Sequence, residues 1–292
     1  MIRPRVLAAI AAAAVLPVSL ALLPPATADP ATVPNGPWPQ GEENTNAIRS
    51  YERLWSTLEA IEGRAKGSFD LSPAPLTSNT GREIPVVTIG DGDTDVMFVA
   101  NQHGNEYIVS NGMISVIRGL TSGSAQAEAI AMRLLWDERQ PRLVVDFHHQ
   151  GTYVDDEGRM ITGSVMWPNA EEEAEALGIS EEFAGVVTDS KRVVSEMLEA
   201  LEGKGYANIT RYPSTPFPGI ARNAYGLLGS ASVLYEARGD MGQASSGMIA
   251  KQTEVAGTAI LRAAADGSLW TRDTVPADTI RERGPFVPDP HE

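Results

Sequence analysis

The chain has 292 residues, of which 42% are hydrophobic and 21% are charged. These proportions are typical of a globular protein with one large domain or two small ones, and they exclude a disordered polyelectrolyte and a multi-span membrane protein. The formal net charge of −15 disfavours a nucleic-acid binder, because binding to a phosphate backbone needs a cationic surface. It equally disfavours adhesion to anionic lipid.

The first 28 residues differ in composition from the rest of the chain. Arg3 and Arg5 give a basic start, residues 6–23 are almost entirely apolar, and Ala26-Thr27-Ala28 has the small-x-small pattern that a signal peptidase accepts. A transmembrane anchor is the alternative, which the prolines within and after the apolar run disfavour. We therefore expect a signal peptide at residues 1–28, a secreted protein, and no membrane contact after cleavage.

The remainder is predicted to form a single α/β domain. A Pro-rich leader spans 29–44, the main domain spans 45–266, and 267–292 form a C-terminal tail that is expected to lie loosely on the surface. Hydrophobic patterns predict strands at 83–89, 95–100, 142–147 and 231–235, and helices from Thr45 to about residue 61 and at 107–118, 125–136, 171–177, 181–201 and 247–265.

Polar side chains follow three of the predicted strands. The segment His103-Gly104-Asn105-Glu106 comes after one strand, His148 and His149 after the next, and Glu236 after the last. Ligands of α/β sheets bind beyond the carboxyl ends of strands, so these side chains are expected to lie close together. The chain has no Cys and only four His, which means that a metal site would have to use His and carboxylate ligands.

A metal site is the hypothesis that this arrangement favours. His103 and Glu106 have i, i+3 spacing, so both side chains can reach one ion, and His148 could supply a third ligand. Such a set leaves a fourth position open for water, as in catalytic zinc sites, and Glu236 would be the base. The alternative is that the pair lies on the surface and that His148 is an ordinary hydrogen-bonded residue.

These residues resemble the zinc carboxypeptidase family, the carboxypeptidase A-like metallopeptidases. The resemblance begins at Ser50-Tyr51, continues through Gly81-Arg82-Glu83-Ile84-Pro85 and His103-Gly104-Asn105-Glu106, and ends with Asp146-Phe147-His148 and Leu234-Tyr235-Glu236-Ala237-Arg238. It implies a mixed, mostly parallel sheet flanked by helices. It also implies one Zn2+ held by His103, Glu106 and His148, with Glu236 as the catalytic carboxylate.

The chain departs from the family between the second and third implied ligands. Only 41 residues separate Glu106 from His148. The family's additional strand and its Asn-Arg pair, which binds the substrate carboxylate, are missing from this interval. We therefore expect a sheet that lacks one family strand and is either rearranged around the gap or prone to aggregate.

Other residues could contribute to the site. Arg222 is a possible substitute for the missing arginine, as are Arg142 and Arg238, and Tyr225 lies where the family has a substrate-contacting tyrosine. Asp146, two positions before His148, could orient that imidazole or could be a plain buried polar residue.

The expected function is hydrolysis of peptide amide bonds by zinc-activated water with a glutamate base, as in a metallocarboxypeptidase. The expected partner is a peptide or small amide substrate, and the sequence does not determine the oligomeric state. Two alternatives remain: a remnant that binds metal or peptide without turnover, and a zinc amidase or deacylase on the same scaffold.

Overall fold

The computed structural model describes residues 4–10, 49–78, 80–90, 94–103, 106–121, 140–203, 207–239 and 243–287. The cleavage site after Ala28, the leader at 29–44 and the predicted helix at 125–136 lie outside the described residues. No helix in the described ranges is long and apolar enough to cross a membrane.

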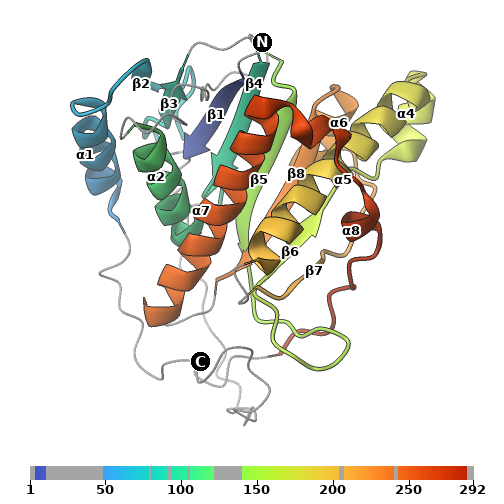
Figure 1. Ribbon diagram of the computed structural model, residues 1–292. Coiled ribbons are helices and arrows are strands. Elements are labelled where there is room, and N and C mark those ends of the chain that lie inside the picture. Colours follow the sequence, from blue (N-terminus) through green and yellow to red (C-terminus); the bar gives the residue numbers. More distant parts are fainter. Residues whose placement is uncertain are drawn as a thin grey trace.

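The centre of the molecule is a mixed sheet, as predicted, and it has eight strands in the described part of the chain (Figure 1). Its order is β2-β3-β1-β4-β5-β8-β6-β7, and the pairs β1/β4, β4/β5, β5/β8 and β6/β7 are parallel. The strands are β1 (Pro4–Ile10), β2 (Phe69–Pro73), β3 (Pro85–Ile89), β4 (Thr94–Ala100), β5 (Leu143–Gln150), β6 (Gly163–Met166), β7 (Ile209–Arg211) and β8 (Ala231–Arg238).

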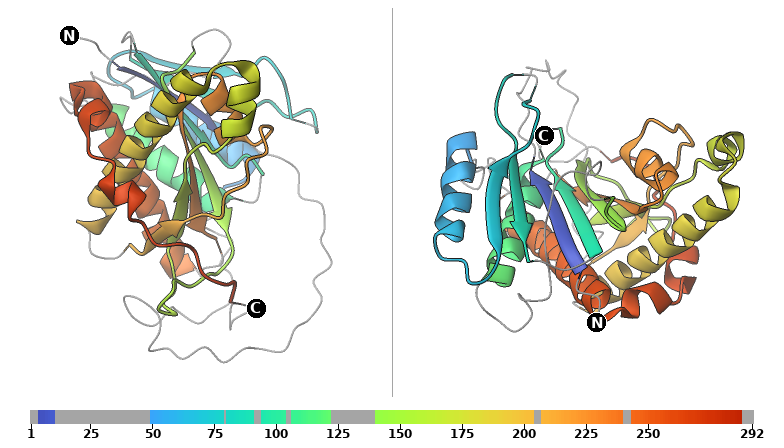
Figure 2. Two further views of the ribbon diagram at one scale, coloured as in Figure 1. Left: turned by 90° about the vertical axis from the view of Figure 1, so that its right-hand side faces the viewer. Right: turned by 90° about the horizontal axis from the view of Figure 1, so that it is seen from above.

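Helices cover both faces of the sheet (Figures 1 and 2). The helices α2, α5 and α7 pack together on one face, α6 lies on the other, and α1 lies beside α2 and β2. Their bounds are α1 (Tyr51–Glu62), α2 (Tyr107–Thr121), α4 (Glu171–Leu177), α5 (Ser180–Glu202), α6 (Ala221–Leu227), α7 (Gln243–Asp266) and α8 (Val275–Asp278), with a 3-10 helix η4 (Ser268–Thr271).

The burial of the central strands explains their composition. Every residue of β8 is buried, and β5 is buried along its whole length except at one half-buried position. Strands covered on both faces lose the alternation of apolar and polar residues, which is why they have nearly continuous apolar sequences. The helix layer is packed equally closely: a Cβ at Gly112 of α2 would lie 2.6 Å from Thr253 Cβ of α7, so only glycine fits there.

The position between β3 and β4 is occupied by β1, from the segment that was expected to be a signal peptide. The parallel register with β4 runs from Pro4↔Thr94 to Ile10↔Ala100, and four of the same residues, Val6 to Ala9, also pair antiparallel with β3. Within the described residues, the interval from Glu106 to His148 contributes α2 and the start of β5 to the fold. A strand from a distant part of the chain thus completes the sheet in this structure.

Two expectations about element boundaries were wrong. The strands β5 and β8 continue to Gln150 and Arg238, so His148 and Glu236 lie within strands rather than after them. The polarity of these residues hid the continuation, because both face a polar site rather than solvent.

The described part of the tail, residues 267–287, is not loose, contrary to expectation. Leu269 and Ala277 are fully buried, and Arg281 donates hydrogen bonds to Asp155 and Asn208 of the domain.

Several short elements were not predicted from the sequence, because three to seven residues are too few to establish a period. These are the strands β2, β6 and β7 and the helix α6.

Candidate metal centre

A tight turn after β4 positions the first two predicted ligands. Asn101 follows the strand with a positive φ of 62°, a conformation that asparagine tolerates better than most residues. Its Oδ1 accepts a hydrogen bond of 2.8 Å from the backbone N–H of Glu106. This bond folds the segment back on itself, so that His103 and Glu106 point toward β5.

The structure brings His103, Glu106 and His148 together. His103 Nδ1 lies 2.8 Å from Glu106 Oε1, and His148 Nδ1 lies 3.1 Å from both of these atoms. Ligands about 2.0–2.1 Å from a tetrahedral ion are separated from one another by about 3.3 Å. The three donor atoms therefore form a triangle slightly smaller than a tetrahedral site requires, and small side-chain shifts would fit a metal ion. The described residues contain this one candidate metal cluster.

The opposite nitrogen of His148 is bound by Asp146. His148 Nε2 lies 2.8 Å from Asp146 Oδ2, and both residues are buried. A carboxylate that accepts the Nε2 proton leaves Nδ1 unprotonated in the neutral ring, which is the form that a metal ligand needs. Asp146 therefore occupies the orienting position that the sequence suggested.

Charges in the cluster oppose the effect of burial. Burial alone would raise the pKa of Glu106, but hydrogen bonds from His148 and His103 lower it to about 2. Burial would lower the pKa of His148, but Asp146 and Glu106 raise it to about 10. Without a metal, His148 is thus the cation that two buried carboxylates share.

Glu236 lies directly opposite His148 on the neighbouring strand. The register pairs His148 with Glu236, so their side chains share one face of strands that run about 4.8 Å apart. Burial raises the pKa of Glu236 to about 7, against the lowering effect of the His148 charge. Its Oε2 is buried without a hydrogen-bond partner within the described part of the chain. A carboxylate poised near neutral pH with a free oxygen suits a general base.

The two predicted substrate residues lie on α6, over the same face of the sheet. Arg222 is 3% exposed, and its Nη2 donates to Thr215 O at 3.1 Å. Burial lowers its pKa, while the charges of Tyr212 and Glu236 raise it, which places this guanidinium within electrostatic range of the site. Tyr225 packs on Met97, Val99 and Val144 at the base of this face.

A second arginine near Glu236 was missed by the sequence analysis. The Arg283 guanidinium lies 3.6 Å from the ring centroid of Tyr153 and 4.4 Å from that of Tyr212, and its Nη1 donates to Gln150 Oε1 at 2.8 Å. Its charge lowers the pKa of Glu236, against the dominant effect of burial. No local pattern in the tail indicates this role. Gln150 could have been found, because it follows His148 by two positions on the same face.

The remaining candidates make contacts of their own. Arg142, before β5, stacks on Trp270 at 3.5 Å, and Arg238 donates through Nε to Thr152. His149 points to the opposite face, as expected for adjacent strand residues, and its Nε2 accepts from the Val109 N–H at 3.2 Å. His291 lies outside the described residues.

The comparisons with known proteins identify the fold. No family model and no curated protein matches the chain. Among solved structures, a metallo-carboxypeptidase from Burkholderia cenocepacia matches 76% of this chain and 70% of its own with 13% identity and a TM-score of 0.52. A protein titled a putative metallopeptidase from Shewanella denitrificans matches 77% of this chain and 99% of its own, with 11% identity and a TM-score of 0.41. The resemblance read from the sequence is therefore confirmed at the level of fold: the chain has the α/β fold of a metallo-carboxypeptidase and carries a candidate His-Glu-His metal site.

Proposed function

We propose that this protein is a secreted, zinc-dependent hydrolase of peptide amide bonds that acts as a metallocarboxypeptidase. The observation that supports the proposal most strongly is the convergence of three donor atoms within 3.1 Å of one another beside Glu236. His103, Glu106 and His148 would hold one Zn2+. When bound, the metal would polarise the scissile carbonyl and lower the pKa of water.

Glu236 would perform the proton transfers. Its pKa of about 7 allows it to accept a proton from the attacking water near neutral pH and to return that proton to the departing amine. The neighbouring Gln150 side chain donates to Ser164 Oγ at 2.9 Å and to the backbone oxygen of Glu236 at 3.3 Å, which helps to fix this strand position.

Two arginines support a substrate with a free carboxylate. Neither Arg222 nor Arg283 forms an ion pair with a carboxylate in the described part of the chain, although both lie near Glu236. Nε of each is buried without a hydrogen-bond partner among the described residues. Buried cations are normally paired, so an anionic group of the substrate would complete this wall of the site. Arg283 would thus do the work of the arginine that the short interval lacks.

A remnant that binds metal without turnover is the second candidate, and the short interval between Glu106 and His148 favours it. Zinc content and turnover separate the two proposals. The purified protein should hold about one zinc, and Glu236→Gln should keep the metal while hydrolysis falls by about 10²–10⁴-fold. Glu172→Gln, an exposed change on α4, is the matched control and should alter neither quantity.

The substrate class requires a separate assay. A peptide with a free C-terminal carboxylate should be cleaved faster than its C-terminal amide, and Arg283→Gln should remove most of that difference. Bound zinc without turnover of either peptide would establish the remnant, and turnover of small N-acyl amino acids alone would favour an amidase or deacylase. A protein that binds no zinc under zinc-replete conditions would contradict the metal proposal.

A further inference from the structure

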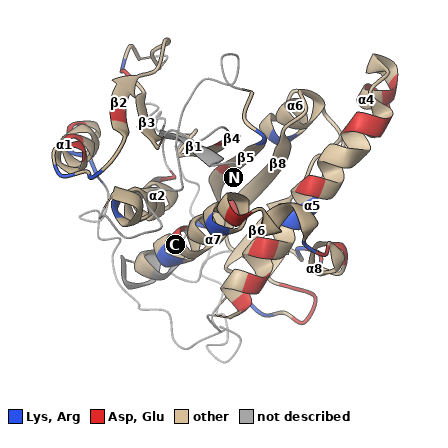
Figure 3. Cartoon of the chain, turned by 45° about the horizontal axis from the view of Figure 1, so that its top comes forward, with Lys and Arg blue, Asp and Glu red and all other residues tan. Residues whose placement is uncertain are grey.

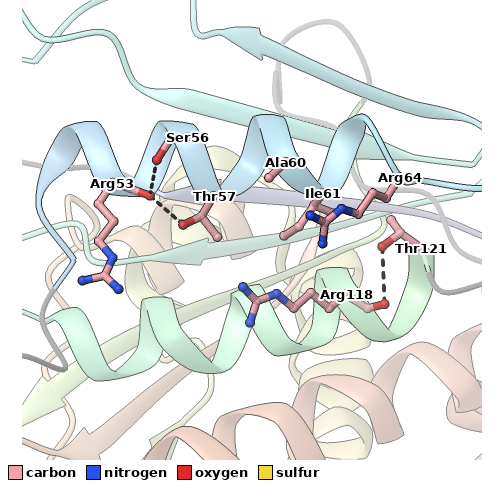
Figure 4. A pocket seen from close by; sticks show the side chains of 8 residues that line it. All are labelled: Arg53, Ser56, Thr57, Ala60, Ile61, Arg64, Arg118 and Thr121. Atoms are coloured by element: carbon pink, nitrogen blue, oxygen red, sulfur yellow. Dashed lines mark hydrogen bonds between the residues drawn. The ribbon is translucent and has the colours of Figure 1, made fainter.

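A pocket lies away from the metal centre, between α1 and α2. Its volume is about 440 Å³. The side chains of Arg53, Arg64 and Arg118 extend into the space between the two helices, and the apolar side chains of Ala60 and Ile61 form one wall (Figure 4). Arg118 lies eleven residues along α2 from its first residue, about 16 Å from the end that adjoins Glu106. The pocket is therefore separate from the hydrolytic site.

The pocket concentrates positive charge in an acidic protein. Arg49, just before α1, is not part of the lining but adds a guanidinium nearby, which donates to Asn111 of α2. Burial lowers the pKa of Arg49, and the charges of Arg118 and Arg53 lower it further, so Arg49 lies close enough to these two cations to be repelled by them. This cluster occurs in a chain whose formal net charge is −15 and which carries rows of acidic residues along α4 and α5 (Figure 3).

Helical geometry keeps acidic partners out of the pocket. Arg53, Thr57, Ala60 and Arg64 are spaced by three or four positions, so they share one side of α1 and its C-terminal end. The acidic residues of the same helix fall on its other sides. Within the described ranges, Arg53, Arg64 and Arg118 form no ion pair. The positive charge of the three pocket arginines is thus left without a counter-charge from the described chain.

We propose that this pocket binds a phosphate group, either as inorganic phosphate or on a small phosphomonoester. Guanidinium groups donate paired hydrogen bonds to phosphate oxygens, and a tetrahedral anion can accept such pairs from several directions at once. Phosphate carries between one and two negative charges near pH 7, which would offset the repulsion among the arginines. The hydroxyls of Ser56 and Thr57 already donate to Arg53 O, so the arginines supply the recognition.

Calorimetric titration of the full chain with inorganic phosphate and with methyl phosphate, in metal-free buffer at constant ionic strength, tests the proposal. We expect binding of at least one of the two anions, weakened at least tenfold by Arg118→Gln. Arg118→Lys should lose part of the affinity, because it keeps the charge without the paired donors. The tighter of the two probes identifies the source of the phosphate group.

Two control variants locate the binding. Arg82→Gln removes an exposed arginine outside the pocket and should change the affinity by less than twofold. Arg283→Gln should also leave it unchanged, which excludes binding beside Glu236. Zinc content and peptide hydrolysis should be the same in Arg118→Gln as in the unmodified protein, so this proposal and the proposed hydrolase fail independently. Absence of binding, or equal weakening by Arg82→Gln and Arg118→Gln, would overturn the inference.

Discussion

The two halves of the sheet are built in different ways. The strands β5, β8, β6 and β7 all come from residues 143–238 and pair with one another in a continuous block. The other half, β2-β3-β1-β4, takes its third strand from residues 4–10, far from the rest of that half in sequence. One half of the sheet is therefore complete by itself, whereas the other depends on the N-terminus.

The candidate metal centre lies where the halves meet. His103 and Glu106 follow β4, while His148 and Glu236 belong to β5 and β8. The backbone pairing of β4 with β5 is thus what brings the two sets of ligands together. Disturbance of the dependent half should therefore move His103 and Glu106 relative to His148.

Removal of residues 1–28, the change that signal cleavage would make, should have the largest effect. It would leave the facing edges of β3 and β4 with unpaired backbone groups. At about 1 kcal/mol for each net hydrogen bond, the free energy of unfolding should fall by on the order of several kcal/mol. Denaturant titration of the full chain and of the chain that begins at Asp29 measures the difference, and zinc content shows whether His103 and Glu106 stay in place.

A single substitution tests the contribution of β1 without removal of the rest of the N-terminal segment. Ala8→Pro removes one backbone donor from a strand that is paired on both sides, so it should also lower the free energy of unfolding. If the truncated protein unfolds cooperatively at the denaturant concentration of the full chain, β1 contributes nothing to stability. The comparison between the halves would then be wrong.

The sequence predicts two strands of each half, β5 and β8 in the complete half and β3 and β4 in the dependent one, and it misses the other two of each. The apolar runs at 142–147 and 231–235 predicted β5 and β8, because strands buried on both faces have continuous apolar sequences. The run that begins at Val6 has the same property, but a basic start and a small-x-small end also make it a signal peptide, and the two uses cannot be separated by composition. Arg283 was invisible for another reason: its place depends on how the tail packs against Tyr153 and Tyr212.

Loss of His148 should destabilise the metal-free protein more than loss of His103. His148 is buried between Asp146 and Glu106, so His148→Ala leaves two buried carboxylates without their cation and should reduce the free energy of unfolding by about 3–5 kcal/mol. The His103 side chain is 65% exposed, and His103→Ala should change the free energy of unfolding by less than about 1 kcal/mol. Both should lose zinc affinity. Equal destabilisation of the metal-free protein by both substitutions would contradict the asymmetry.

Glu236 should give the metal-free protein a pH-dependent stability. Its pKa is about 7 in the folded chain against an ordinary value of 4.5, so the folded state retains a proton that the unfolded state has lost. Stability from this group is complete below pH 4.5 and is lost as the pH rises through 7. Glu236→Gln cannot ionise, so above pH 7 it should be more stable than the unmodified protein by up to about 3 kcal/mol. Unfolding curves of both proteins at pH 4.5 and pH 8 test this prediction. If Glu236→Gln were more stable than the unmodified protein only at pH 4.5, the prediction would be wrong.

The smallest effect should come from Asp146, which contacts the proposed metal only through His148. Asp146→Asn keeps an oxygen that can accept the Nε2 proton but removes the charge, and such changes behind a ligand histidine lower metal affinity by about 10–100-fold. Chelator competition measures the loss, with the exposed Asp278→Asn as the control. If Asp146→Asn and Asp146→Ala weaken zinc binding equally, the charge of Asp146 is what matters. If Asp146→Ala weakens zinc binding much more than Asp146→Asn, the carboxylate acts mainly by holding the imidazole with Nδ1 toward Glu106. Asp146 and His148 both lie on β5, so this orientation should not depend on the pairing of β1.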